Sequence, residues 1–461
     1  MEIDQASLYV PDNTAPETKP CDCSTGSLPA TESRNLIVCI DGTSNKFGTK
    51  NTNVVELYSH ILKKINDNQL TYYDSGIGTF ARPSWRSFSY LRQIVNNKID
   101  LAIAWNLEKV ILGAYRWISN HYRPGDKIFL FGFSRGAYQV RVLAGMIHAV
   151  GLILPGNEAQ IPFAFELYSA YNSNIKLAEN FKKTFSQESV RIHFLGAWDT
   201  VSSVGVLRSK TVPLVVGFCE HICIFRHALA LDECRVKFLP EYIHEGASHT
   251  PDEILDATPR AEHCTANIKE VWFAGTHADM DNTDLQSGDI PLLWMRNEAI
   301  QAGLRLKPTN IQWKQEYLEE PPRESLVGLW WLLEYLPLRR LSFDNAKDTT
   351  YRLHAGQSRK IVEGQKIHAS VIFRPGYRPK AAYPGYPFAD WPHQLDLNEP
   401  ASHQRLKALG ESESHWETDL FDLWPVGLLF HESAPPQEHI EHLIERVAFL
   451  SSFGSSVIFF S

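Results

Sequence analysis

The chain has 461 residues, of which 44% are hydrophobic and 21% charged, and its formal net charge is −8. This length allows a large buried core in one to about three domains, and an acidic balance without a basic stripe excludes an electrostatic groove for nucleic acid. No stretch reaches the roughly 18 apolar residues of a membrane span, and seven cysteines spread through apolar segments predict reduced thiols in a cytoplasmic protein.

The N-terminal segment, residues 1–33, is rich in Pro, Thr, Ser and acidic residues. It lacks the basic and apolar regions of a signal peptide. Because this composition has little to bury, we predict a disordered tail. Order is expected to begin at the apolar run NLIVCIDGT, which ends in Asp41, Gly42 and Thr43.

Strand-like and helix-like stretches then alternate along the chain. Helical spacing predicts helices over 54–65, 96–122, 136–153 and 290–303. Apolar runs predict strands over 127–134, within 190–201 and 268–280, and in 70–79, where the strand enters a glycine loop. Strands separated by long helical connections predict an α/β fold, with a mostly parallel sheet and helices on both faces.

The remaining segments are long for simple connections. Residues 155–189 and 203–265 are expected to form helical insertions above the sheet, and the apolar run at 211–231 is interpreted as a buried helix pair. Residues 306–461 contain one late strand candidate at 366–375. We expect this part to be a C-terminal extension packed on the 34–305 domain, as a lid or cap, and not an independent domain.

The motif Gly-Phe-Ser-Arg-Gly at 132–136 interrupts a buried strand just before a helix. In a nucleophile elbow, the serine lies on a strained turn between strand and helix, and the glycines Gly132 and Gly136 allow that turn to close around Ser134. A tight turn that merely contains a serine is the alternative, and the context of the motif must decide between them.

Four predicted strands end in residues capable of chemistry: Asp41, Ser134, Asp199 and His277. The carboxyl ends of parallel strands meet at one edge of a sheet. The order serine, aspartate, histidine is also that of α/β-hydrolases. These residues therefore predict a catalytic triad, with Ser134 as the nucleophile, His277 as the base and Asp199 orienting the imidazole.

The same mechanism requires donors for the tetrahedral oxyanion. The backbone N–H of Arg135, directly after the nucleophile, is expected to supply one. The loop at Gly42 and Thr43 is expected to supply a second, because glycine allows close approach of the backbone. No metal or cofactor is required by this reaction.

Other interpretations remain open from the residues alone. The position of Asp199 is compatible with a residue that caps the following turn. His277 is compatible with a histidine buried in the core, and Asp-Gly-Thr at 41–43 is compatible with an ordinary turn. The glycine loop at 74–79 lacks the Walker lysine, so nucleotide binding is not expected.

A second class of function is a metal-assisted phosphoester hydrolase. The oxygen-rich set Asp41, Asp199, His277, Asp279 and Asp281 suits Mg²⁺ or Mn²⁺. A third class is a protein that has lost the catalytic activity of a hydrolase and binds partners through the former active-site pocket.

Seven motifs in order resemble the α/β-hydrolase domain of type VI secretion phospholipase effectors. They are NLIVCIDGTSNKFG, YYDSGIGT, GFSRGAY, GLILPGNE with IPFAFELY, GAWDTVSSVG, HALALDECRVKF and VWFAGTHADM. The resemblance covers about residues 34–305, and a weaker similarity continues near 366–378.

This resemblance implies the same roles for Ser134, Asp199 and His277. It also implies an ester substrate, either a small molecule or a lipid such as a phospholipid. Peripheral membrane contact is compatible with such a substrate, and the apolar stretches predict no transmembrane segment. The membrane-docking regions of the secreted effectors are not identified in this chain. The family usually continues its histidine motif as H-x-D-V-G-G, whereas this chain has Asp281 and Asn282 at the two glycines.

Overall fold

The fold is described from a computed structural model of the chain. The described residues are 33–42, 51–64, 68–76, 97–201, 221–243, 267–280, 289–307, 322–328, 330–337, 340–341, 349–362, 365–371, 374, 377–382 and 416–417. All of the predicted N-terminal tail except its last residue, Ser33, lies outside these ranges, so the prediction of disorder stays a prediction.

The main sheet contains the strands predicted from the sequence and two that were not predicted, β7 (Ile222–Ala230) and β12 (Trp416–Glu417). In chain order, the strands of this sheet are β1 (Asn35–Ile40), β2 (Gln69–Asp74), β3 (Lys127–Phe133), β6 (Ile192–Trp198), β7, β8 (Asn267–Phe273), β11 (Lys366–His368) and β12. The helices are α1 (Asn53–His60), α3 (Asn97–His121), α4 (Arg135–Val150), α5 (Ile161–Ser169), α6 (Ile175–Phe185), α7 (Asp289–Gln301) and α9 (Trp330–Glu334).

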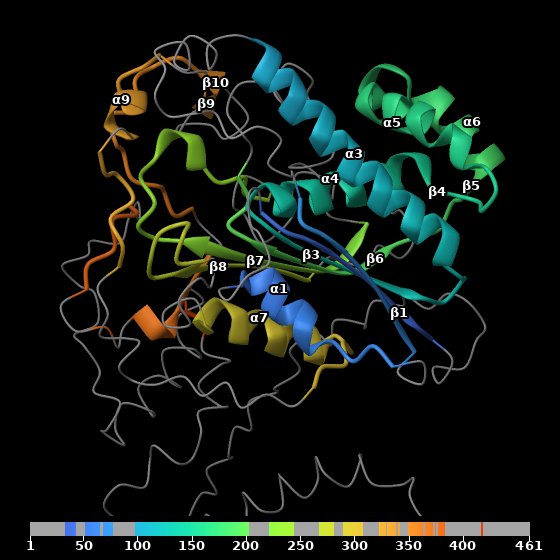
Figure 1. Cartoon of the computed structure of the whole chain (residues 1–461), viewed down its shortest axis with the longest axis horizontal. Helices are drawn as coiled ribbons and strands as arrows, with labels where there is room; N and C mark the ends of the chain where they lie inside the picture. Colours follow the sequence, from blue (N-terminus) through green and yellow to red (C-terminus); the bar gives the residue numbers. More distant parts are fainter. Residues whose placement is uncertain are drawn as a thin grey trace, which may run out of the picture.

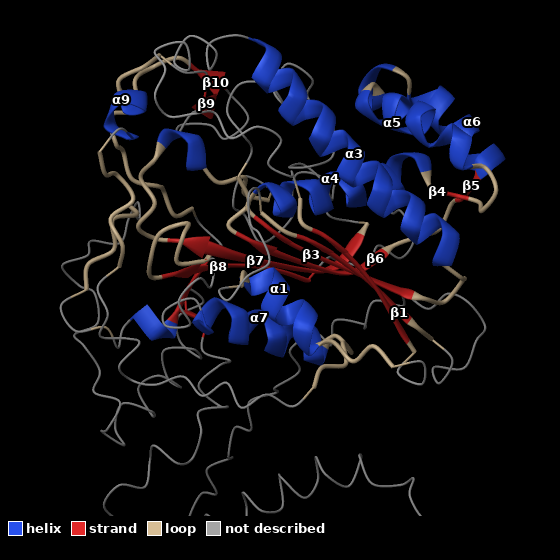
Figure 2. Cartoon of the chain, in the orientation of Figure 1, coloured by secondary structure: helices blue, strands red, loops and turns tan. Residues whose placement is uncertain are grey.

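These eight strands form one sheet in the order β12-β11-β8-β7-β6-β3-β1-β2. Every pairing between neighbours in it is parallel. Helices α3 and α4 cover one face, and α1 and α7 cover the other (Figure 1). Figure 2 shows the sheet between these two helical layers. The prediction of an α/β fold with a mostly parallel sheet is confirmed.

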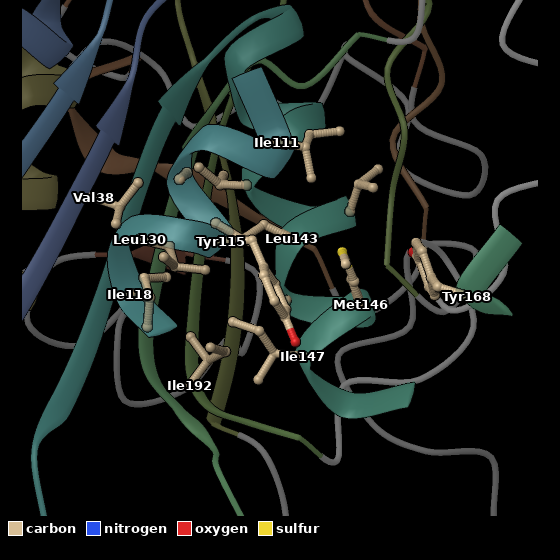
Figure 3. Close-up of a cluster of buried hydrophobic side chains, with 14 of the residues drawn as sticks. Val38, Ile111, Tyr115, Ile118, Leu130, Leu143, Met146, Ile147, Tyr168 and Ile192 are labelled. Atoms are coloured by element: carbon tan, nitrogen blue, oxygen red, sulfur yellow. The ribbon is translucent and has the colours of Figure 1, made fainter. Parts of the chain in front are cut away.

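Each face of the sheet has its own hydrophobic core. Successive side chains of a strand point to opposite faces, so Leu36, Val38 and Ile40 of β1 join one core while Ile37 and Cys39 join the other. Figure 3 shows the first core, where strand residues Val38, Leu130 and Ile192 meet Ile111, Tyr115 and Ile118 of α3 and Leu143, Met146 and Ile147 of α4. Burial on both faces explains why these strands read as continuous apolar runs.

The described part of the stretch from 203 to 265, residues 221–243, departs from the prediction of helical insertions. Residues 222–230, which we interpreted as part of a buried helix pair, form β7 between β6 and β8. A segment that is buried on all sides is apolar throughout, so its sequence shows no periodicity that would distinguish a strand from a helix. The charged residues in the run are also paired: Arg226 binds Glu298 of α7, and His227 Nδ1 lies 2.8 Å from Glu270 Oε1 of β8.

The insertion expected at 155–189 is helical. Helices α5 and α6 contribute Ile161, Leu167 and Phe181 to the core beside α4. The Nζ of Lys182 donates to the carbonyl of His148 in α4 at 2.8 Å. A two-stranded antiparallel pair, β4 (Leu152–Ile153) with β5 (Ser186–Gln187), closes this unit and was not predicted.

The late strand candidate at 366–375 is a strand over only part of its length. Residues 366–368 form β11, which pairs with β8, and a short 3₁₀ turn follows at Ala369–Val371. Farther out, β9 (Arg340–Leu341) and β10 (Thr349–Thr350) form a separate antiparallel pair.

The cysteines correct one prediction. Among the described residues, Cys39 and Cys234 are free thiols, whereas Cys223 is disulfide-bonded. The prediction that all thiols are reduced is therefore wrong for Cys223, and the cysteine argument for a cytoplasmic protein loses its basis. As for membrane segments, no helix within the described ranges has the length and apolar character needed to cross a bilayer.

Candidate active site

Ser134 lies on a sharp turn between β3 and α4. Its backbone angles are φ 58° and ψ −120°, a conformation that non-glycine residues rarely adopt. The turn closes because its two glycines lack Cβ atoms. A Cβ on Gly132 would lie 2.5 Å from the carbonyl oxygen of Gly136, and a Cβ on Gly136 would lie 2.2 Å from the carbonyl oxygen of Ile40. This is the geometry of a nucleophile elbow.

The structure brings Ser134, Asp199 and His277 together in one hydrogen-bonded array. The Nε2 atom of His277 lies 2.9 Å from the Oγ of Ser134. The Nδ1 atom of the same ring is hydrogen-bonded to Oδ2 of Asp199. All three residues are buried and follow β3, β6 and β8 respectively. Three side chains far apart in the sequence thus converge at the carboxyl edge of the sheet.

Asp199 is held by more than the histidine. Its φ of 43° is a second strained backbone angle at this site. Oδ1 accepts the N–H of Ala230 at 3.1 Å, and Nη1 and Nη2 of Arg359 donate to Oδ1 and Oδ2 at 2.5 and 2.9 Å. Burial acts to raise the pKa of Asp199, but the Arg359 guanidinium and the bond to His277 outweigh it and hold that pKa well below its usual range.

The imidazole of His277 is held by two aromatic rings, and its backbone is held by a carboxylate. Its ring stacks on Phe133 and lies against Phe238, each with a centroid separation of 4.8 Å. The backbone N–H of His277 donates to Oε2 of Glu233 at 3.2 Å. Burial acts to raise the pKa of Glu233, but its ion pair with Arg235 outweighs it and lowers that pKa. Glu233 therefore remains an anionic acceptor.

The three residues predicted for the oxyanion hole differ in whether their backbone N–H groups are already hydrogen-bonded or described at all. Arg135 is the first residue of α4, where backbone N–H groups have no partner within the helix. Burial lowers the pKa of its guanidinium to about 10. The N–H of Gly42 instead donates to Oδ1 of Asp41 at 2.6 Å. Thr43 lies outside the described residues.

The acidic residues considered for a metal are already bonded to protein groups. Oδ2 of Asp41 accepts from Thr52 and Tyr73, at 2.8 and 3.1 Å. Oδ2 of Asp279 accepts the backbone N–H of Thr276 at 2.7 Å. Asp281 lies outside the described residues. Among the residues that the structure describes, no group of three or more His, Cys, Asp or Glu side chains is arranged to hold a metal ion.

Two contributors to this array were missed from the sequence. Glu233 lies in the motif HALALDECRVKF, to which we assigned no role, so an acidic residue in a quoted motif was an available signal. Arg359 lies 160 residues after Asp199, in a segment without a readable pattern, and no local signal pointed to it.

Fold and site together define an α/β protein with a serine, histidine and aspartate array at the carboxyl edge of a parallel sheet. The sequence profile described as "T6SS, Phospholipase effector Tle1-like, catalytic domain" matches residues 34–298, more than half of the chain. The chain belongs to this family of catalytic domains, as the resemblance predicted.

Individual proteins are similar over parts of the chain. The uncharacterized protein YEL023C of Saccharomyces cerevisiae is 38% identical over 220 residues, which cover 44% of this chain and 32% of the yeast protein. The match therefore spans about a third of that relative's length.

Two solved structures are similar at low identity. A crystal structure of an uncharacterized protein from Pseudomonas aeruginosa shares 16% identity with a TM-score of 0.33, over 62% of this chain and 48% of that one. A structure of the Tle1 effector bound to the VgrG spike of the Type 6 secretion system shares 17% identity with a TM-score of 0.27, over 54% and 51%.

Proposed function

We propose that this protein is a serine hydrolase that cleaves carboxylic esters with Ser134, His277 and Asp199. The observation that carries the proposal is the 2.9 Å contact between the Ser134 hydroxyl and His277 Nε2, on a ring whose Nδ1 is bonded to Asp199. A carboxylate can only accept hydrogen bonds, so the Nδ1 atom carries the proton and the Nε2 lone pair faces the serine.

The reaction then follows from the positions of these groups. As Oγ of Ser134 bonds to the carbonyl carbon, its proton passes to Nε2 of His277, and Asp199 stabilises the imidazolium. The oxyanion accepts the N–H of Arg135, at the positive end of α4. Collapse of the tetrahedral intermediate breaks the ester bond, and Nε2 returns the proton to the leaving alcohol. Water, activated by the same histidine, releases the acid and restores the serine.

The substrate class that we propose is lipid acyl esters, among them phospholipids. Membership of a phospholipase effector family supports a lipid. A second support is the group of exposed apolar side chains on and around α9, which lies next to the residues that contact His277. Trp330 of α9 lies against Phe238, with ring centroids 5.7 Å apart. Peripheral contact with a membrane is therefore part of the proposal.

The arrangement of Asp199 favours this reaction over metal-assisted phosphoester hydrolysis. Both carboxylate oxygens of Asp199 are bonded to the Arg359 guanidinium. A metal ion at the same oxygens would have to displace this cation. Treatment with EDTA is accordingly expected to leave the rate unchanged.

Hydrolysis of p-nitrophenyl esters of graded chain length tests the proposal. Ser134→Ala and His277→Ala each remove a reacting group, so we expect kcat to fall at least about 1,000-fold. A fluorophosphonate probe should label the wild type and fail to label Ser134→Ala. Ser186→Ala is the matched control, because the buried Ser186 hydroxyl lies outside the site and has no hydrogen-bond partner within the described part of the chain.

Equal turnover by wild type and Ser134→Ala overturns the proposal. Absence of turnover and of labelling in the wild type favours instead a hydrolase-fold binding protein.

A further inference from the structure

Arg359 brings a second charge to the catalytic aspartate from far along the chain. It lies beyond the segment matched by the family profile, which ends at residue 298. Its side chain is only 1% exposed. Burying a cation is costly unless it is paired and hydrogen-bonded, so the surroundings of this guanidinium are specific.

Four acceptors surround the guanidinium. Two are the carboxylate oxygens of Asp199, at 2.5 and 2.9 Å. The others are the carbonyl oxygens of Ala230, at 3.1 Å, and Phe238, at 2.6 Å. A planar guanidinium that bonds both carboxylate oxygens fixes the plane of the carboxylate as well as its position.

We propose that Arg359 is a positioning residue for ester hydrolysis, acting through Asp199 on the histidine base. This inference rests on the proposed function, and it extends the catalytic array from three side chains to four: Ser134, His277, Asp199 and Arg359.

The first consequence is geometric. Asp199 directs Oδ2 toward Nδ1 of His277, and the bidentate contact with Arg359 prevents the carboxylate from rotating away. The same guanidinium bonds the carbonyl of Phe238, whose ring lies against the imidazole. Arg359 thus holds both the orienting carboxylate and one wall of the histidine site.

The second consequence is electrostatic. Uptake of a further proton by the pair formed by Asp199 and His277 would occupy Nε2 of the imidazole and inactivate the base. A cation bonded to Asp199 opposes the uptake, so Arg359 keeps the base active to lower pH. Removing the cation must therefore move proton uptake to higher pH.

Other titratable groups lie near this array, and two of them, Glu233 and Tyr242, interact directly with the charge of Arg359. The groups are Glu233 with its partner Arg235, the buried phenol of Tyr242, and His227, which is bonded to Glu270. The signals of His277 itself, compared between wild type and variant, are therefore the readout that reports on the base.

The first experiment compares Arg359→Gln and Arg359→Lys with the wild type in kcat, KM and the pH dependence of kcat/KM. We expect Arg359→Gln to lower kcat about 100-fold by misplacing the base, with little change in KM. Its acid limb should move up by about one pH unit. Arg359→Lys keeps the positive charge but loses the bidentate contact with Asp199. We therefore expect kcat to fall while the acid limb of the pH profile stays at its wild-type pH. Arg378→Gln, at an exposed arginine, is the control and should match the wild type.

The second experiment does not depend on turnover. In protein labelled with ¹⁵N-histidine, the ring signals of His277, assigned by their loss in His277→Gln, are followed by NMR as the pH is lowered. In Arg359→Gln these signals should titrate at higher pH than in the wild type. Thermal unfolding of each variant verifies that it is folded.

The outcomes separate this inference from the proposed function. Loss of the ester reaction in the wild type overturns the function, while the NMR comparison still tests the role of Arg359. An acid limb and a His277 titration that both stay at their wild-type pH in folded Arg359→Gln overturn the inference. If Arg359→Gln does not fold, an unchanged kcat in Arg359→Lys overturns the inference instead.

Discussion

At the level of single residues, the site depends on how closely two backbone segments approach. The carbonyl groups of Ile40 and Asp41, at the end of β1, lie against the elbow, where a Cβ on Gly136 would be 2.2 and 2.5 Å from their oxygens. The strained φ values of Ser134 and Asp199 occur in the same small region. Strain of this kind persists only where the surrounding structure enforces it.

Substitution of this glycine is expected to be severe. Gly136→Ala forces a methyl group into two backbone carbonyls, so we expect the free energy of unfolding to fall by about 3 kcal/mol. The proposed esterase activity should be lost together with the elbow geometry. The measurement is urea denaturation followed by circular dichroism.

Gly113→Ala is the matched control for this prediction. Gly113 lies within α3, and among the described residues its added Cβ would meet only the side-chain hydroxyl of Tyr72, at 3.1 Å. Alanine is a better helix former by about 1 kcal/mol, so the net change should be small. Equal losses in the two variants would contradict the account of the elbow.

At the level of elements, α9 has an exposed apolar surface and is anchored to the rest of the protein by a buried residue. The exposed side chains on and around it are Val327, Trp331, Leu332, Tyr335, Leu336, Tyr351 and Leu353. Beneath them, buried Glu334 accepts the N–H of Val236 at 2.7 Å and bonds His354. Figure 1 shows α9 beside the turn that follows β7, which carries Phe238.

Tryptophan and tyrosine are enriched where proteins meet the membrane interface. We therefore expect the full-length protein to sediment with phosphatidylcholine vesicles, and expect Trp331→Ser with Tyr335→Ser to weaken this binding at least about fivefold by loss of buried apolar area. Cleavage of a soluble short-chain ester should not change.

The control for the vesicle experiment is Ile175→Ser with Leu177→Ser. These two side chains of α6 are 46% and 49% exposed, close to the 43% of Trp331, and they lie on another helix. Equal effects of the two pairs of substitutions would assign the binding to general hydrophobicity and remove α9 as the docking surface.

At the level of the whole molecule, the segment after residue 305 completes the structure that the earlier part begins. Strand β11 pairs with β8, and Ile361, Ile367 and Val371 belong to the core on the α1 and α7 face. Arg359 neutralises the buried Asp199. We propose that residues 306–461 are an extension of the 34–305 domain and not an independent one.

Truncation tests this organisation. A chain that ends at residue 305 loses these core side chains and leaves the charge of Asp199 buried without its cation, a loss of about 3–5 kcal/mol from the charge alone. We expect it to be insoluble or unfolded. Removal of residues 1–32 should leave the unfolding midpoint unchanged. A cooperatively folded 1–305 chain, observed by circular dichroism and thermal unfolding, would refute the proposal.

Much of this organisation was predictable from local patterns. The periodicity of α1, α3, α4 and α7 and the apolar runs of β1, β3, β6 and β8 identify the sheet and its helices, because burial on one or two faces leaves a period in the sequence. The Gly-Phe-Ser-Arg-Gly motif located the elbow. Since parallel strands end at one edge, the residues that follow them were expected to meet there.

Strand β7 and Arg359 mark what the sequence alone did not determine. In β7 the apolar run contains Arg226 and His227, and only their partners on α7 and β8 explain why such residues lie in a buried strand. The contact between Arg359 and Asp199 joins segments 160 residues apart. A repeating pattern reports which side of an element is buried, but not which distant group it meets. Pairing of buried charges is therefore decided only when the tertiary structure brings both partners out of water.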